Sequence, residues 1–369
     1  MGKQVKTPRF YVDMPTFLHA TGQLGWDENK GGAELLYMNC SNPYLQDTES
    51  NTMFVIGNVT NNAPKTSFPI NFCGLLNHNL ASDTNVYNVV GKSSVSSNLN
   101  QVVGESFSTS SFTNREIVLN YDGTNGINAS YNGTTIWTFS DSNGIDKYWR
   151  NFDIFFPNGF DDYTHQLGSF VVGKYFDCPN SPDLSLTMSR RFDGIKKQKT
   201  IGGKTLANIY YDGPTEWTMN HPTNGTYKYP PFELDTTAHV DTQGYRFDYR
   251  AKSGLGRKGL RSWNLTFSYI SEDNMWIDNE VSSKVTSDSI DDGQSPTGGN
   301  NPNPMLTDNS FNFVWNCTLG GTLPFIFQPD NTNNNPDQFS ICTFRENTLS
   351  VKQVAFNTYT LSITIDEVA

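Results

Sequence analysis

The stretch RSWNLTFSYI, from Arg261 to Ile270, predicts a β-strand that buries one of its two faces. Every second residue is apolar and polar residues stand between them, which is the period of a half-buried strand. The end of the chain repeats this pattern from Tyr359 to Asp366. Together the two stretches predict an antiparallel sheet with one wet face. The expected apolar face comprises Trp263, Leu265, Phe267, Tyr269, Tyr359, Leu361, Ile363 and Ile365.

Three further apolar stretches lie between these two and extend the expected sheet. They are Phe311–Cys317, Leu323–Asp330 and Gln338–Phe344. We find no competing helical period in them, so each is expected to contribute a strand. This end of the chain is therefore expected to form an antiparallel β-sandwich or open barrel. Its expected core residues are Trp263, Phe267, Phe313, Phe325 and Ile363.

Strand-like runs also fill the first half of the chain, where Asp-Gly and Asn-Gly pairs predict hairpin turns. The runs lie at 54–57, 68–82, 86–90, 116–119, 135–139, 152–156 and 170–176. Their spacing is typical of a β-sandwich. A short strand at 9–14 and one helical turn at 16–21 precede them. The fold class expected for the whole chain is all-β.

A change of composition at residues 181–199, which are polar and then basic, predicts a linker between two β-domains. The expected organisation is a segment at 1–45 that attaches the N-terminus to the next domain, a β-domain at 46–180, the linker at 181–199 and a second β-domain at 200–369. A long polar stretch at 278–305 interrupts the second domain. We expect it to be a mobile, solvent-exposed or partner-ordered excursion.

The order of these sequence segments resembles that in the minor and distal tail proteins of long-tailed phages. In the last third of the chain the likeness rests on the Arg-x-Trp-x-Leu-x-Phe strand, the turn GTLPFIFQPD at 321–330 and the closing acidic strand. The opening of the tail β-domain is similar to 200–204 with 210–213. In the first half, Phe68–Ser82 and the exit after Phe170–Phe176 resemble a discoidin-like jelly roll. The resemblance implies a jelly-roll-like sandwich followed by a tail-tube-like β-sandwich or barrel.

The resemblance also implies a function. It predicts a virion structural protein of the tail tip, assembled in the host cytoplasm, whose ring joins the tail tube to the distal tip or fibres. By analogy the ring is a homo-hexamer that contacts tube, hub and fibre proteins, with DNA passing through its lumen. In the jelly-roll family the His and Asn mostly form a polar turn beside the strand, which is the structural reading of His78. Because the same fold also binds carbohydrate, His78 and Asn79 are candidate glycan contacts as well. The alternative function is a receptor- or glycan-binding module of the virion.

The charge of the chain argues against a nucleic-acid binder. Lys and Arg number 26 against 37 Asp and Glu, which gives a net charge of −11 and repels phosphate backbones. Basic residues gather locally at 190–199 and 250–261. We interpret them as solvated loops or as contacts with an acidic neighbouring subunit. In a ring, the acidic balance would keep passing DNA from adhering to the lumen.

The sequence segments that partly match catalytic, metal-binding or cofactor-binding motifs each lack a required residue. We therefore expect neither an enzyme nor a cofactor. A phosphate loop ending in Gly203-Lys204-Thr205 needs a glycine where Gln198 stands. A calcium loop counted from Asp288 has Ile290 and Gly299 at ligand positions. The five histidines form no pair with zinc-ligand spacing. The adjacent carboxylates at 161–162 and 291–292 would point apart on a strand, so a sugar-degrading enzyme has no local support.

The cysteines and the apolar content bear on the compartment. Five cysteines without a Cys-x-x-Cys pair predict reduced, mostly buried thiols, of which Cys317 and Cys342 fall within apolar runs. The N-terminus lacks the apolar region of a signal peptide, and nowhere do 18 apolar residues run together. We therefore expect neither a secreted precursor nor insertion into a membrane.

Overall fold

The protein is described by a computed structural model. The residues that it describes are 5–22, 35–39, 44–45, 52–56, 68–78, 88–92, 101–103, 114–119, 134–140, 147–149, 151–155, 166–191, 195–209, 260–277, 309–334 and 338–368. The polar stretch at 278–305 lies outside them. All structural statements below concern the described residues.

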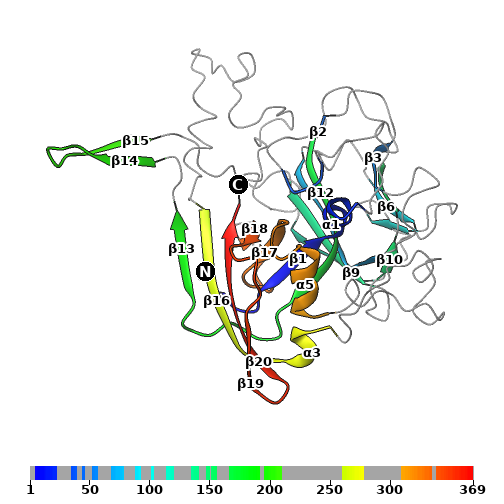
Figure 1. Ribbon diagram of the computed structural model, residues 1–369. Helices are drawn as coiled ribbons and strands as arrows, with labels where there is room; N and C mark the ends of the chain where they lie inside the picture. Colours follow the sequence, from blue (N-terminus) through cyan, green and yellow to red (C-terminus); the bar gives the residue numbers. More distant parts are fainter. Residues whose placement is uncertain are drawn as a thin grey trace, which may run out of the picture.

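One antiparallel sheet of twelve strands dominates the structure (Figure 1). Its main path is β13 (Thr187–Arg191), β16 (Leu260–Ser271), β20 (Thr358–Glu367), β18 (Ser340–Phe344), β17 (Phe325–Gln328), β1 (Arg9–Asp13), β12 (Gln166–Asp177), β5 (Phe72–His78), β9 (Thr134–Ser140) and β8 (Asn114–Leu119). β19 (Val351–Ala355) pairs with β20, and β2 (Tyr44–Leu45) pairs with β12. The prediction of an all-β protein is confirmed, and the described strands form no closed barrel.

Three smaller sheets and three short helices complete the described structure. The sheets are β3–β11–β6–β7 (Thr52–Ile56, Asn151–Phe155, Asn88–Lys92, Gln101–Val103), β10–β4 (Lys147–Trp149, Phe68–Ile70) and β14–β15 (Ile195–Lys199, Thr205–Ile209). The helices are α1 (Met14–Ala20), α3 (Glu272–Met275) and α5 (Phe311–Cys317). The range 181–199, predicted to be a linker, thus contains β13 and β14.

Strand β1 occupies the middle of the large sheet although it lies near the N-terminus. It pairs with β12 on one side, Phe10 opposite Phe176, and with β17 on the other, Phe10 opposite Phe327. Its residues from Phe10 to Asp13 are all buried, so both faces of the sheet are covered here. Strands from the first half of the chain and from its end therefore share one continuous sheet through β1.

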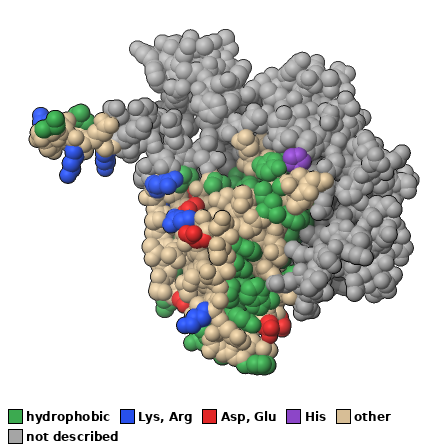
Figure 2. Space-filling view, viewed as in Figure 1, with side chains coloured by type: hydrophobic (Ala, Val, Ile, Leu, Met, Phe, Trp, Pro, Cys, Tyr) green, Lys and Arg blue, Asp and Glu red, His purple; other side chains and the backbone are tan. Residues whose placement is uncertain are grey.

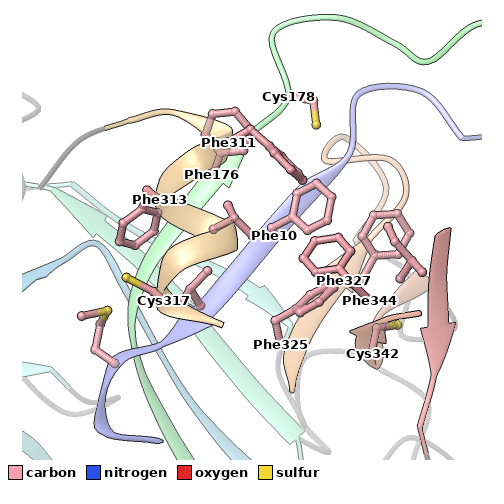
Figure 3. Packing of buried hydrophobic residues seen from close by; sticks show 14 of the residues in the cluster. Phe10, Phe176, Cys178, Phe311, Phe313, Cys317, Phe325, Phe327, Cys342 and Phe344 are labelled. Atoms are coloured by element: carbon pink, nitrogen blue, oxygen red, sulfur yellow. The ribbon is translucent and has the colours of Figure 1, made fainter. Parts of the chain in front are cut away.

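An aromatic core covers one face of this junction (Figure 3). The ring of Phe10 lies 5.5 Å from that of Phe325 and 5.2 Å from that of Phe327, measured between centroids. Phe311 of α5 meets Phe10 edge-on at 5.9 Å. Such tilted and edge-on contacts add to the stabilisation from burying the rings. The five predicted core residues are all buried, which confirms that part of the prediction: Trp263, Phe267, Phe313, Phe325 and Ile363.

The expected strand at Phe311–Cys317 is wrong, because this stretch forms helix α5. Its aromatic residues alternate, but residues three and four positions apart are also apolar, so seven residues fit either period. The helix buries Phe311 and Val314 in the core, and Thr318, which follows its last residue, donates its hydroxyl to the carbonyl of Val314 at 2.8 Å. Tertiary packing against β1 decides between the two periods here.

Tyr269 also departs from the expected pattern. The strand alternation places it on the buried face, yet 74% of its surface is exposed. The pairing of β16 with β20 shifts register between Phe267 and Ile270, and Tyr269 takes a φ of 65°. Such a bulge turns the side chains that follow it to the other face. Ile270 is buried in place of Tyr269.

Candidate functional site

The two predicted glycan contacts are only partly described. His78 is the last residue of β5, where its backbone pairs with Leu167 of β12. The side chain of His78 and all of Asn79 lie outside the described residues. A glycan contact at these two residues therefore stays a prediction.

Asp13 is an ionisable group that is buried among the described residues. It ends β1 and precedes α1, and it is buried. Thr16 donates its hydroxyl to one carboxyl oxygen at 2.5 Å, and the backbone N–H of Val172 donates to the other at 3.1 Å. Burial raises the pKa of Asp13 to about 7, and these hydrogen bonds oppose the rise. The carboxyl group thus joins β1, α1 and β12.

The segment 35–39 attaches to the same place. The backbone N–H of Tyr37 donates to the Thr16 hydroxyl at 3.0 Å, and the Tyr37 hydroxyl lies 2.8 Å from Nδ1 of His19. Tyr37 has a φ of 61°, in the left-handed region that a residue with a side chain rarely adopts. These contacts hold a loop against α1, and they assign Asp13 and Thr16 a structural task.

Two arginines bind carboxylates across neighbouring strands. Arg9 forms a two-pronged pair with Asp177, and its guanidinium lies 4.1 Å from the centre of the Tyr175 ring. Arg261 contacts Glu367 through its side chain at 3.0 and 2.8 Å and through its backbone N–H at 2.8 Å. Bidentate pairs of this kind fix geometry as well as charge. Both arginines tie strands of the large sheet together.

The described thiols are packed into the core. Cys73, Cys178, Cys317 and Cys342 are buried, and burial raises the pKa of the last three thiols. A protonated, enclosed thiol is a poor nucleophile. Within the described ranges no three His, Cys, Asp or Glu side chains gather to hold a metal ion. These thiols, like Asp13 and the paired arginines, stabilise the fold. The candidate functional sites described next are therefore surfaces formed by exposed side chains.

The first candidate surface is the basic hairpin, defined as residues 195–209 with strands β14 and β15. Figure 1 shows it standing away from the large sheet, and Figure 2 shows lysine and apolar side chains along it. Its exposed side chains include Lys197, Lys199, Lys204 and Leu206, and Ile201 at the tip is fully exposed.

The tip of the hairpin is a defined turn. The N–H of Thr200 donates to the carbonyl of Lys204 at 2.8 Å, and the N–H of Lys204 donates to the Thr200 hydroxyl at 3.1 Å. Gly203 supplies the left-handed conformation that the turn needs, with a φ of 81°. Ile201 is therefore presented on an ordered turn.

The second candidate surface is the end patch, at the opposite end of β16. Its apolar members are Leu184, Tyr269, Val354 and Phe356, and its acidic members are Glu272 and Asp273, all of them exposed. Hydrogen bonds bring the segments together: Asp183 N–H donates to the carbonyl of Thr266 at 2.8 Å, and Glu272 N–H donates to that of Asn357 at 3.2 Å. Two turns, at 184–185 and 356–357, and helix α3 thus bring large apolar side chains and two carboxylates to one end of β16.

Strand β13 offers a third surface feature next to these two. All five of its residues are exposed, and within the described part of the chain it pairs with β16 alone. The outer edge of a strand presents N–H and C=O groups that can pair with another chain. The large sheet therefore ends, on this side, in an edge that could be extended.

The chain matches no family model, no curated protein and no solved structure. None of the described helices has the length and apolar character that crossing a membrane requires.

Sequence reasoning located part of this surface and missed the rest. The basic cluster at 190–199 suggests loops or a subunit contact, but Arg190 and Arg191 lie in β13 and residues 195–199 form β14. The Gly-Gly turn between two β-prone runs at 195–209 is the signal in the sequence that predicts the hairpin. The end patch had no signal in the sequence. It depends on a bulge at Tyr269 and on two turns and helix α3, which meet only in the folded chain.

Proposed function

We propose that this protein is a structural subunit of a phage tail tip, which acts by binding other protein subunits rather than by catalysis. In this role it forms a ring that joins the tail tube to the distal tip or fibres. The sequence segments between Gly259 and Val368 that resemble distal tail proteins support the proposal. The buried and paired ionisable groups, such as Asp13, Arg9 and Arg261, support it as well. Those groups lock strands together and leave the contact surfaces to exposed side chains.

The basic hairpin is the observation that carries this proposal. Two strands without a packed face are marginally stable in water. Its side chains from Lys197 to Ala207 are exposed, and among the described residues no third strand pairs with it. An arm of this kind gains its stability from a partner. A protein that carries such an arm, next to the open edge of β13, is suited to assembly.

Cryo-electron microscopy of intact tails tests the proposal. We expect density for this chain in a closed ring around the tail axis, with six copies by analogy with the family. Antibody labelling of the purified virion locates the chain independently. Single copies at fibre tips, with no ring around the axis, would favour the receptor-binding alternative. A virion without this chain would refute both.

A further inference from the structure

We propose that the basic hairpin of one copy docks on the end patch of a second copy of the same chain. This proposal deepens the proposed function, on which it rests, by naming the contact between subunits. The two surfaces are those already defined: residues 195–209 on one copy, and Leu184, Tyr269, Val354, Phe356, Glu272 and Asp273 on the other.

The distribution of charge favours a second copy of the chain as the partner of the hairpin. The hairpin contains Lys196, Lys197, Lys199 and Lys204 and no acidic residue. The chain as a whole carries −11, so the residues outside the hairpin carry −15 once its +4 is set apart. A second copy is therefore an acidic partner for the arm. The end patch offers Glu272 and Asp273 of α3, both exposed, at the place where the docking would occur.

Apolar complementarity favours the same pair of surfaces. Ile201 projects from the turn of the hairpin with its side chain fully exposed, and Leu206 is more than half exposed. On the end patch, Phe356 is 88% exposed and lies on the turn between β19 and β20. Interfaces concentrate their binding energy in apolar anchors of this kind, surrounded by polar groups. Lysines beside Ile201 and carboxylates beside Phe356 meet that description.

The distance between the hairpin and the end patch of one chain indicates that the hairpin docks on the patch of another molecule. The hairpin follows β13, whose last residue Arg191 pairs with Leu260 at the beginning of β16. Tyr269 lies nine residues further along β16, which is about 30 Å at the rise of a strand. Figure 1 shows the hairpin directed away from the sheet, at the end opposite to α3 and the β19–β20 turn. The arm of one copy can therefore meet the patch of the next without folding back on its own sheet.

A contact between two different surfaces of identical chains is head-to-tail. It repeats from copy to copy and gives a ring when the rotation closes and a filament when it does not. The arm and the patch thus supply the repeat that a ring of identical subunits needs. Docking would also bury the apolar side chains of both surfaces, which are exposed in the single chain.

Cross-linking between two differently tagged chains tests the contact. One chain carries Ile201→Cys and the other Phe356→Cys, and a short bismaleimide is added to the concentrated mixture of full-length proteins. We expect a cross-linked dimer that contains both tags. The matched control replaces Phe356→Cys by Leu319→Cys, which is also an exposed apolar residue but lies outside the end patch. The wild-type chain reports any reaction of its own cysteines.

Charge reversal gives the second readout. Lys197→Glu combined with Lys199→Glu should lower the cross-linked yield about tenfold, and raising the salt from about 0.05 M to about 1 M should act in the same direction. A cross-linked yield from Ile201→Cys with Phe356→Cys that does not exceed the Leu319→Cys control overturns the docking proposal. That result leaves the proposed function intact, since the ring is scored by microscopy of the tail. A chain absent from the tail would refute the function and leave a positive cross-link standing.

Discussion

Arg9 of β1 faces Asp177 of β12 directly across the antiparallel pairing, and two hydrogen bonds of 2.6 and 2.8 Å join the guanidinium to the carboxylate. Asn331, which follows β17, donates its side-chain amide to the same carboxylate at 3.1 Å. One carboxylate of β12 therefore contacts both the N-terminal strand β1 and a loop of the last third of the chain. The pair fastens β1 at the point where the two halves of the sheet meet.

Replacing Asp177 by Asn should destabilise the protein by about 1–3 kcal/mol, because it leaves the mostly buried Arg9 guanidinium without its counter-charge. Urea denaturation measures the change in the free energy of unfolding. Asp366→Asn is the matched control: its partner Arg345 is 51% exposed, so the loss should be about 1 kcal/mol or less. Equal losses in the two variants would show that Arg9 and Asp177 act as an ordinary surface pair.

The buried carboxyl of Asp13 should make stability depend on pH. Its pKa is raised from 3.8 to about 7 in the folded protein, so the folded state keeps a proton that the unfolded state releases. The free energy of unfolding should therefore fall as pH rises from about 4 to about 7, by at most about 4 kcal/mol from this group. The Asp13→Asn variant should lack this part of the decline.

The Asp13 experiment compares unfolding curves at several pH values between these limits. Thr16→Ser keeps a hydroxyl next to the carboxyl group, and its stability should follow the wild-type dependence on pH. If Asp13→Asn and the wild type decline in parallel, then Asp13 titrates normally in the folded protein.

Because of the bulge in β16, truncating Phe267 and truncating Tyr269 should lower the free energy of unfolding by different amounts. Phe267→Ala should destabilise the protein by about 3–5 kcal/mol, because the ring is buried in the core. Tyr269→Ala should cost about 0.5 kcal/mol or less, because that side chain is exposed. Thermal or urea unfolding of the two variants measures both. A larger loss for Tyr269→Ala would mean that the two faces of the strand are reversed.

Limited proteolysis tests the proposed division into two β-domains. We expect the first cuts within 181–199 or 278–305, and not within 349–365, which contains β19 and most of β20. Because β1 pairs with both β12 and β17, the fragments should stay together and elute as one species in gel filtration without denaturant. First cuts within 349–365 would contradict the domain division. Fragments that separate without denaturant would show that the sheet does not hold the two halves together.

The amino-acid sequence alone was enough to predict the all-β class, the strands near 261–270 and 359–366, and the burial of the five core residues of the C-terminal part. The strands and the buried face with Trp263, Phe267 and Ile363 follow from alternation within single segments, because a strand with one apolar face must turn that face inward wherever it pairs. Phe313 is buried too, but on helix α5 and not on the expected strand. The burial of Trp263 and Ile363 needed no knowledge of their partners. The buried state of Cys342 follows in the same way from its apolar neighbours, whereas Cys317 is buried on helix α5.

Long-range packing and pairing determine the helix at Phe311–Cys317, the exposure of Tyr269 and the central position of β1 in the large sheet. Seven residues with aromatic alternation fit a helix as well as a strand, and the choice depends on Phe10 and Phe344, which pack against Phe311 from distant parts of the chain. The bulge at Tyr269 arises from the register with β20, about ninety residues later. The end patch exists because turns far apart in the sequence meet at one end of a sheet, and such meetings are set by long-range pairing that no single segment encodes.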